Sequence, residues 1–140
     1  MLETPSRFFI MNNSFGSIEL TKSGKNDIEA ISELGEGWVA EETLAIAVYC
    51  SLKYHNNFEE AVITSVNHSG DSDSTGSVTG NIMGAIHGYE KIPEQYLKNL
   101  ELKNIILEIA DDLHRDCQTH EFQEEPWTDE DYKWFNKYAC

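Results

Sequence analysis

Four glycines recur at intervals of four residues between positions 76 and 88 of this 140-residue chain. Because an α-helix turns once in about 3.6 residues, this spacing places them along one helical face. Glycine in a helix interior costs about 1 kcal/mol relative to alanine, so such a face needs a physical reason. The spacing therefore predicts a helix from about Gly76 to His87 that a neighbouring helix or a ligand approaches closely. The apolar stripe beside it is Val78, Ile82, Ala85 and Ile86.

Apolar residues in the rest of the chain also follow helical spacing. We expect further helices over residues 26–34, 39–54, 58–66 and 102–113, a short helical segment between Pro93 and Leu100, and a helix from about Thr128. No segment shows the alternation of a strand, so the predicted fold class is all-α. The chain divides into a poorly defined N-terminal segment (1–25), a helical region (26–115) and an acidic C-terminal tail with a short helix (116–140).

The composition excludes some classes of partner. Ten Lys and Arg stand against 25 Asp and Glu, which gives a net charge of −15. Such a charge disfavours binding to nucleic acid or to an anionic membrane, and fits a solvated surface or a partner with a basic face. The three cysteines, an odd and sparse set, do not make a disulfide framework. With no secretory signal and no apolar run near the length of a membrane span, we expect a cytoplasmic protein.

The segment from Asn67 to Gly76, NHSGDSDSTG, carries the strongest chemical signal. Asp71 and Asp73 lie two residues apart, and the hydroxyls of Ser74 and Thr75 follow. Such a turn presents several hard oxygen ligands to one point, which is what Mg²⁺, Mn²⁺ or Ca²⁺ requires. The segment therefore favours a metal site.

Three other types of sequence motif contain some of the same residues. A helix-loop-helix calcium loop is matched by Asp71, Asp73 and Gly76, but Ile82 stands where that loop needs a bidentate Glu. A phosphatase D-x-D-x-T loop should follow a buried strand, and residues 64–68 do not form one. A plain helix cap with solvated carboxylates is the third. Taken alone, the motif divides evenly between cap and metal site, and the surrounding glycines favour the metal.

Two segments resemble the ADP-ribosylglycohydrolase family, which includes dinitrogenase reductase-activating glycohydrolase and the J1 crystallins. They are residues 35–47, GEGWVAEETLAIA, and residues 67–76. The resemblance extends in register over about residues 26–115. It implies a compact all-helical fold with a centre of two Mg²⁺ or Mn²⁺ ions, and a hydrolase that removes ADP-ribose from a modified side chain or a small acceptor.

The resemblance also implies roles for individual residues. Asp71 and Asp73 would be carboxylate ligands of the metal ions, and Ser74 would supply a hydroxyl ligand. Gly37, Trp38 and Val39 would lie along the ADP-ribose. By contrast, we interpret His68 as a hydrogen-bonded loop residue, and Glu41 and Glu42 as caps of their helix.

One departure from the family limits the prediction. Family members carry a catalytic acid in a glycine-rich N-terminal segment, followed by a Thr-Asp-Asp-like segment with the other metal ligands, and neither is found in residues 1–25. The catalytic acid is therefore unknown, and the chain resembles the C-terminal part of the fold. We expect weak activity or none from the isolated chain, with a complementing N-terminal chain or self-association to complete it. The alternative is a catalytically inactive fragment, or a regulatory module that binds ADP-ribose.

Overall fold

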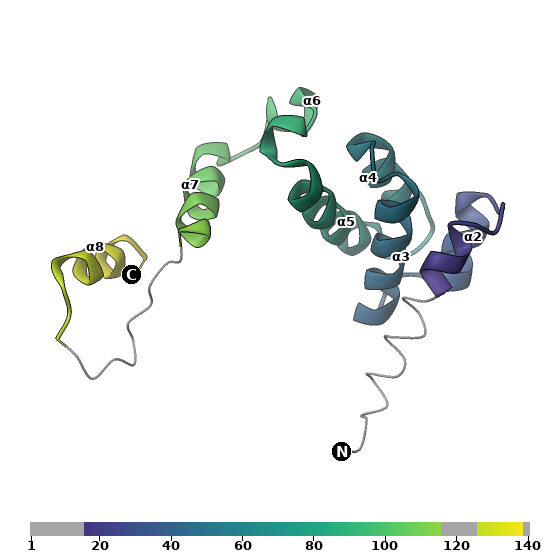
Figure 1. The fold of residues 1–140 in the computed structure, drawn as a ribbon, viewed down its shortest axis with the longest axis horizontal. Coiled ribbons are helices and arrows are strands. Elements are labelled where there is room, and N and C mark those ends of the chain that lie inside the picture. Colours follow the sequence, from purple (N-terminus) through teal and green to yellow (C-terminus); the bar gives the residue numbers. More distant parts are fainter. Residues whose placement is uncertain (1–15, 116–125, 139–140) are drawn as a thin grey trace, which may run out of the picture. The chain divides into compact units, whose positions relative to one another are not determined.

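The computed structural model describes residues 16–115 and 126–138, and within these ranges it contains helices and no strand (Figure 1). The all-α prediction is therefore confirmed. The chain divides into two units, one ending at Tyr96 and the other beginning at Leu97. None of the described helices is long and apolar enough to cross a membrane.

The first unit carries four main helices after the helical residues 16–20. They are α2 (Asp27–Leu34), α3 (Ala40–Lys53), α4 (Phe58–Val66) and α5 (Ser72–His87). Two short elements follow, η1 (Tyr89–Lys91) and α6 (Glu94–Leu97). Helix α5 packs against both α3 and α4 (Figure 1).

Local sequence signals explain where these helices begin and end. The Asn26 side chain accepts a hydrogen bond from the Glu29 amide, and the Glu29 side chain returns the contact to the Asn26 amide. Helix α2 then stops at Gly35, whose φ of 125° is open to glycine but strained for other residues. The Asn57 side chain caps α4 by accepting a hydrogen bond from the Glu60 amide.

The apolar core lies between α2 and α3. Its buried members come from these two helices and from the preceding helical residues: Leu20, Ala30, Ile31, Leu34, Ala45, Ile46, Tyr49 and Cys50. Cys50 is fully buried, as expected of a small apolar side chain, and burial raises the pKa of its thiol to about 12. The Ser17 hydroxyl donates to the Ala45 carbonyl at 2.8 Å, which fastens the first helical residues to α3.

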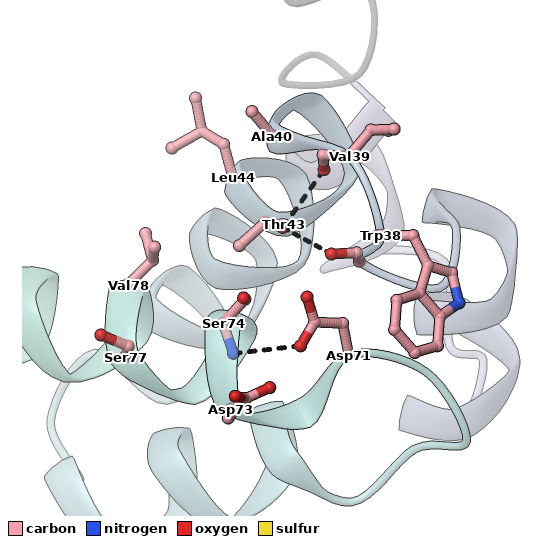
Figure 2. Close-up of a pocket in the computed structure, with 11 residues that line it drawn as sticks. Trp38, Val39, Ala40, Thr43, Leu44, Asp71, Asp73, Ser74, Ser77 and Val78 are labelled. Carbon is pink, nitrogen blue, oxygen red and sulfur yellow. Dashed lines mark hydrogen bonds between the residues drawn. The ribbon is translucent and has the colours of Figure 1, made fainter.

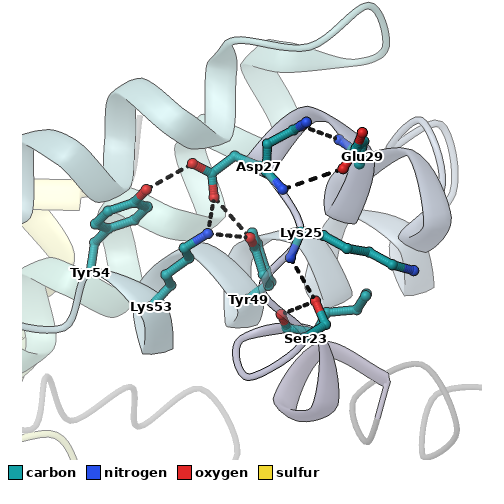
Figure 3. Close-up of polar contacts among 9 residues, drawn as sticks. Ser23, Lys25, Asp27, Glu29, Tyr49, Lys53 and Tyr54 are labelled. Carbon is teal, nitrogen blue, oxygen red and sulfur yellow. Dashed lines mark hydrogen bonds and ion pairs between the residues drawn. The ribbon is translucent and has the colours of Figure 1, made fainter.

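A polar cluster joins the start of α2 to the end of α3 (Figure 3). The Asp27 carboxylate accepts hydrogen bonds from Tyr49 at 2.8 Å, Lys53 at 2.8 Å and Tyr54 at 2.7 Å. Burial alone would raise the pKa of Asp27, but the hydrogen bonds from Lys53, Tyr54 and Tyr49 outweigh it and lower that pKa. Burial, followed by the contact with Asp27, raises the pKa of Tyr49 to about 12, although Lys53 opposes that shift.

The buried face of α5 differs from the prediction. Thr75, Thr79 and Met83 are fully buried, whereas Ile86, from the predicted stripe, is 57% exposed. The threonines can be buried because their hydroxyls bond to nearby carbonyls, Thr79 to Thr75 O at 2.8 Å and Thr75 to Ser65 O at 2.7 Å. Satisfied hydroxyls on small side chains let the helices approach closely, and hydropathy alone does not identify such a face.

The glycine spacing is only partly explained by close packing. A Cβ built at Gly76 would lie 2.5 Å from Cγ1 of Val66. At Gly80 and Gly84 a Cβ would meet nothing within 4 Å. Val66 is the last residue of α4, so the close approach belongs to the connection between α4 and α5 rather than to the whole glycine face. The expectation of close approach by a neighbouring helix was therefore wrong for Gly80 and Gly84 within the described chain, and approach by a ligand stays a prediction.

The second unit contains α7 (Lys103–His114) and α8 (Asp129–Tyr138). Lys137 pairs with Glu108 at 2.5 Å and with Asp112 at 2.6 Å, which joins the two helices. The apolar stripe of α7 remains exposed and comprises Ile105, Ile106, Ile109 and Leu113. Residues 1–15 and 116–125 lie outside the described residues, so the predicted boundaries of the N-terminal segment and the tail stay predictions.

Candidate functional site

The loop between α2 and α3 folds back against the first turn of α3. Gly37 adopts a φ of 81°, and a Cβ there would lie 2.9 Å from Cγ2 of Thr75. The Glu42 carboxylate accepts the amides of Glu36 at 3.2 Å and Gly37 at 3.1 Å. The Thr43 hydroxyl donates to the Gly37 carbonyl at 2.8 Å. The first turn of α3 therefore fixes the loop, and Glu42 caps the loop rather than the helix.

The acidic turn, residues 67–76, leads into α5 and forms its first turn. Asp71 is the N-cap residue, and its side chain accepts a hydrogen bond from the Ser74 amide at 3.4 Å. Because Asp71 satisfies this amide, α5 begins at Ser72, four residues before the predicted start. The cap interpretation of the motif is thus present in the structure, and the Asp73 side chain remains exposed to solvent.

His68 stabilises this turn through contacts of both of its ring nitrogens. Its Nδ1 accepts the Gly70 amide at 3.1 Å, and its Nε2 lies 3.0 Å from the Thr75 hydroxyl. The Thr75 hydroxyl donates to the Ser65 carbonyl, so it accepts from Nε2, which assigns the neutral tautomer with the proton on Nε2. Both ring nitrogens are used within the turn, as the interpretation of His68 as a hydrogen-bonded loop residue requires.

The loop and the acidic turn meet through their backbones. The Asp71 amide donates to the Glu36 carbonyl at 2.7 Å. A Cβ at Gly70 would lie 1.8 Å from the same oxygen, so only glycine permits this approach. Two segments more than thirty residues apart in the sequence are thereby joined by one short hydrogen bond.

A pocket of about 580 Å³ opens where the two segments meet (Figure 2). All six residues predicted for the ligand and the metal line it: Gly37, Trp38, Val39, Asp71, Asp73 and Ser74. Ala40, Thr43, Leu44, Ser77 and Val78 complete the lining. Apolar side chains from α3 and the loop before it face carboxylate and hydroxyl oxygens of the acidic turn. The sequence did not single out Leu44, Ser77 or Val78 as lining residues, since nothing in their type distinguishes them from ordinary helix positions.

The carboxylates of the turn lie close enough to interact. The pKa of Asp71 is held below its usual value, chiefly by a hydrogen bond with the Asp73 side chain and then by one with Ser74. A divalent cation bound at both carboxylates would offset their negative charge.

This donor set fits a hard divalent cation. It contains two carboxylates and one hydroxyl within four residues, which are oxygen ligands of the type that Mg²⁺ and Mn²⁺ prefer. Across residues 16–115 and 126–138, no group of three or more His, Cys, Asp and Glu side chains converges on one point. The turn would therefore supply about half of the roughly six ligands that such an ion takes.

An all-helical unit thus brings the glycine loop, residues 35–39, and the paired carboxylates Asp71 and Asp73 to one pocket. Comparison with known proteins gives the family. The sequence model of the ADP-ribosylglycohydrolase family matches residues 11–123, and the chain belongs to this family.

Several curated proteins are similar to the chain. ADP-ribosylhydrolase ARH3 of Bos taurus is 31% identical over 97 residues, which cover 62% of this chain and 27% of that protein. ADP-ribosylhydrolase ARH1 of Dictyostelium discoideum is 33% identical over 93 residues, or 66% of this chain and 24% of that protein. ADP-ribosyl-dinitrogen reductase glycohydrolase of Rhodospirillum rubrum is 38% identical over 48 residues, or 34% and 16%. The chain thus spans about a quarter of the length of the first relative. No solved structure matches it significantly.

Proposed function

We propose that this chain binds ADP-ribose at the pocket between the glycine loop and the acidic turn, and that it serves the removal of ADP-ribose from a modified side chain or small acceptor. The observation that carries the proposal is the convergence of Gly37, Trp38 and Val39 with the acidic turn on one pocket. The names of the family and of the relatives, which are hydrolases of ADP-ribosyl groups, support the same chemistry.

Asp71, Asp73 and Ser74 would hold one side of a centre of two Mg²⁺ or Mn²⁺ ions. When bound, such ions act as Lewis acids and ease the ionisation of water at neutral pH. The reaction joins the oxygen of water to the anomeric carbon, breaks the C–N or C–O bond to the acceptor, and passes a proton to the released group. In this division of roles, Gly70 and His68 keep the two carboxylates in place, and the loop residues orient the nucleotide.

Isothermal titration of the chain with ADP-ribose, with and without Mg²⁺, tests the proposal. We expect binding that depends on the cation and disappears in Asp71→Ala. Asp111→Ala is a matched control, because Asp111 is exposed and forms an ion pair with Arg115 at the surface of the second unit. ADP-ribose affinity that is the same with and without Mg²⁺, and unchanged in Asp71→Ala, would contradict the assignment of the acidic turn.

The alternative function is binding without hydrolysis, as a regulatory module or as a catalytically inactive fragment. It is favoured by the small number of oxygen donors that the described residues bring together. Release of ADP-ribose from an ADP-ribosylated arginine substrate distinguishes the two. Turnover by the isolated chain comparable to that of a longer relative would exclude the alternative, whereas cation-dependent binding without turnover would support it. A complementing N-terminal chain, or self-association, would then supply the remaining ligands and the catalytic acid.

A further inference from the structure

Glu36 is held at three points, which is unusual for an exposed loop residue. Its amide donates to the Glu42 carboxylate at 3.2 Å, and its carbonyl accepts the Asp71 amide at 2.7 Å. Its carboxylate accepts the indole N–H of Trp38 at 3.0 Å. The backbone of Glu36 is thus fixed from both sides, so its side chain extends from a rigid base.

Trp38 is the side chain that this arrangement constrains. It lines the pocket and is 67% exposed, so packing alone does not hold its ring in one orientation. In Figure 2 the indole nitrogen lies on the side of the ring away from Asp71. Glu36 is not among the residues that line the pocket. Its hydrogen bond to the indole N–H therefore leaves the opposite edge of the ring facing the acidic turn.

We propose that Glu36 is a positioning residue that fixes the Trp38 indole as a flat surface for the bound nucleotide, in register with the acidic turn. The Glu36 carbonyl sets the position of the ring relative to the acidic turn, because this oxygen accepts a hydrogen bond from the Asp71 amide. A rigid aromatic ring loses little conformational entropy on binding, and aromatic faces stack readily on planar bases. This role rests on the proposed function for its ligand, although the constraint on Trp38 is independent of any ligand.

The first measurement reads the constraint without a ligand. The chain has three tryptophans, and Trp38→Phe assigns the Trp38 indole signal in ¹H–¹⁵N spectra. We expect the Trp38 Nε1–H of the wild type to relax as a rigid group, and to become mobile in Glu36→Ala. Glu36→Gln is the matched control, because its side-chain amide oxygen can accept the same bond without the charge. The backbone amide signals of the first unit report whether each variant remains folded, and the indoles of Trp127 and Trp134, in the second unit, serve as reference signals.

The second measurement reads the consequence for binding. ADP-ribose affinity should fall about fivefold in Glu36→Ala, the order expected for one hydrogen bond, and change less than about twofold in Glu36→Gln. Mg²⁺ affinity should be equal in the two variants, since both lack the carboxylate and neither alters a proposed ligand. In the double variant Glu36→Ala/Trp38→Phe, the loss should not exceed that of Trp38→Phe alone, because the two side chains act as one unit.

The outcomes separate this proposal from the proposed function. An indole that is equally mobile in the wild type and in Glu36→Ala overturns the positioning role, whatever the chain binds. Equal ADP-ribose affinity in Glu36→Ala and Glu36→Gln also overturns it. A rigid wild-type indole in a chain that does not bind ADP-ribose overturns the proposed function and supports the constraint on Trp38.

Discussion

Replacing Gly70 by alanine tests the backbone contact on which the pocket depends. The added Cβ would lie 1.8 Å from the Glu36 carbonyl oxygen and 2.6 Å from its carbon. Ordinary carbon–oxygen contact needs about 3.3 Å, so the two segments would have to separate by about 1.5 Å. That separation breaks the 2.7 Å bond from Asp71 to Glu36, because the atoms that clash are backbone and no side chain can swing away.

The cost can be worked from these contacts. Losing the hydrogen bond costs about 1 kcal/mol, and crowding adds about 1–3 kcal/mol. The reduced freedom of the unfolded chain offsets about 0.4–1 kcal/mol of this. We expect the free energy of unfolding, measured by urea titration, to fall by about 2 kcal/mol, and ADP-ribose binding to be lost with it.

Gly80→Ala is the matched control for the same chemical change. Gly80 lies inside α5 with nothing within 4 Å of an added Cβ, so alanine there should stabilise the chain by up to about 1 kcal/mol. Opposite signs for the two substitutions would support the reasoning. Equal effects, or an unchanged stability in Gly70→Ala, would show that the close approach of Gly70 to Glu36 does not hold in solution.

Three further predictions follow from contacts in the first unit. Because the pKa of folded Asp27 is lowered, its carboxylate stabilises the fold above the unfolded pKa of about 3.9. The advantage of the wild type over Asp27→Asn should therefore be constant near neutral pH and shrink below about pH 4; urea titrations that show no such convergence would refute it. Glu42→Ala should lower the unfolding free energy by about 1–3 kcal/mol, because two loop amides lose their acceptor, whereas Glu41→Ala should not. Cys50, in a chain whose other cysteines are serine, should resist a thiol reagent until urea unfolds it, and rapid labelling of the folded chain would contradict its burial.

The positions of the helices were largely predictable because caps and periodicity are local signals. Asn26 and Gly35 bound α2 as expected, and α4 begins at Phe58 and ends at Val66 as predicted. The predicted start of α5 lies four residues too late, because the glycines favoured the metal site over the cap, whereas in the structure Asp71 caps the helix by accepting the Ser74 amide. The buried face of α5 was missed because threonine hydroxyls that bond to backbone carbonyls, Thr79 within α5 and Thr75 to Ser65 of α4, pack like small apolar groups.

The site was predictable as two separate motifs, and only the structure joins them. Nothing local in residues 35–39 indicates that the Glu36 carbonyl accepts the Asp71 amide, since that bond depends on how α3 packs against α4 and α5. The loop-holding role of Glu42 was missed for a related reason: an acidic residue in the first turn of a helix is ordinarily explained by the helix dipole. The metal-binding roles of Asp71, Asp73 and Ser74 stay predictions.

The two packing surfaces within the first unit differ in kind. The contact between α2 and α3 buries large apolar side chains such as Ile31, Ile46 and Tyr49, whereas α5 buries two threonines and one methionine. Apolar burial is the main resistance to local opening, so α5 and its acidic turn should open more readily than the core between α2 and α3. A ligand that contacts both the glycine loop and the turn would hold α5 closed, so its measured affinity would include the free energy of that closure. Substitutions that steady α5 would then tighten binding without touching the ligand.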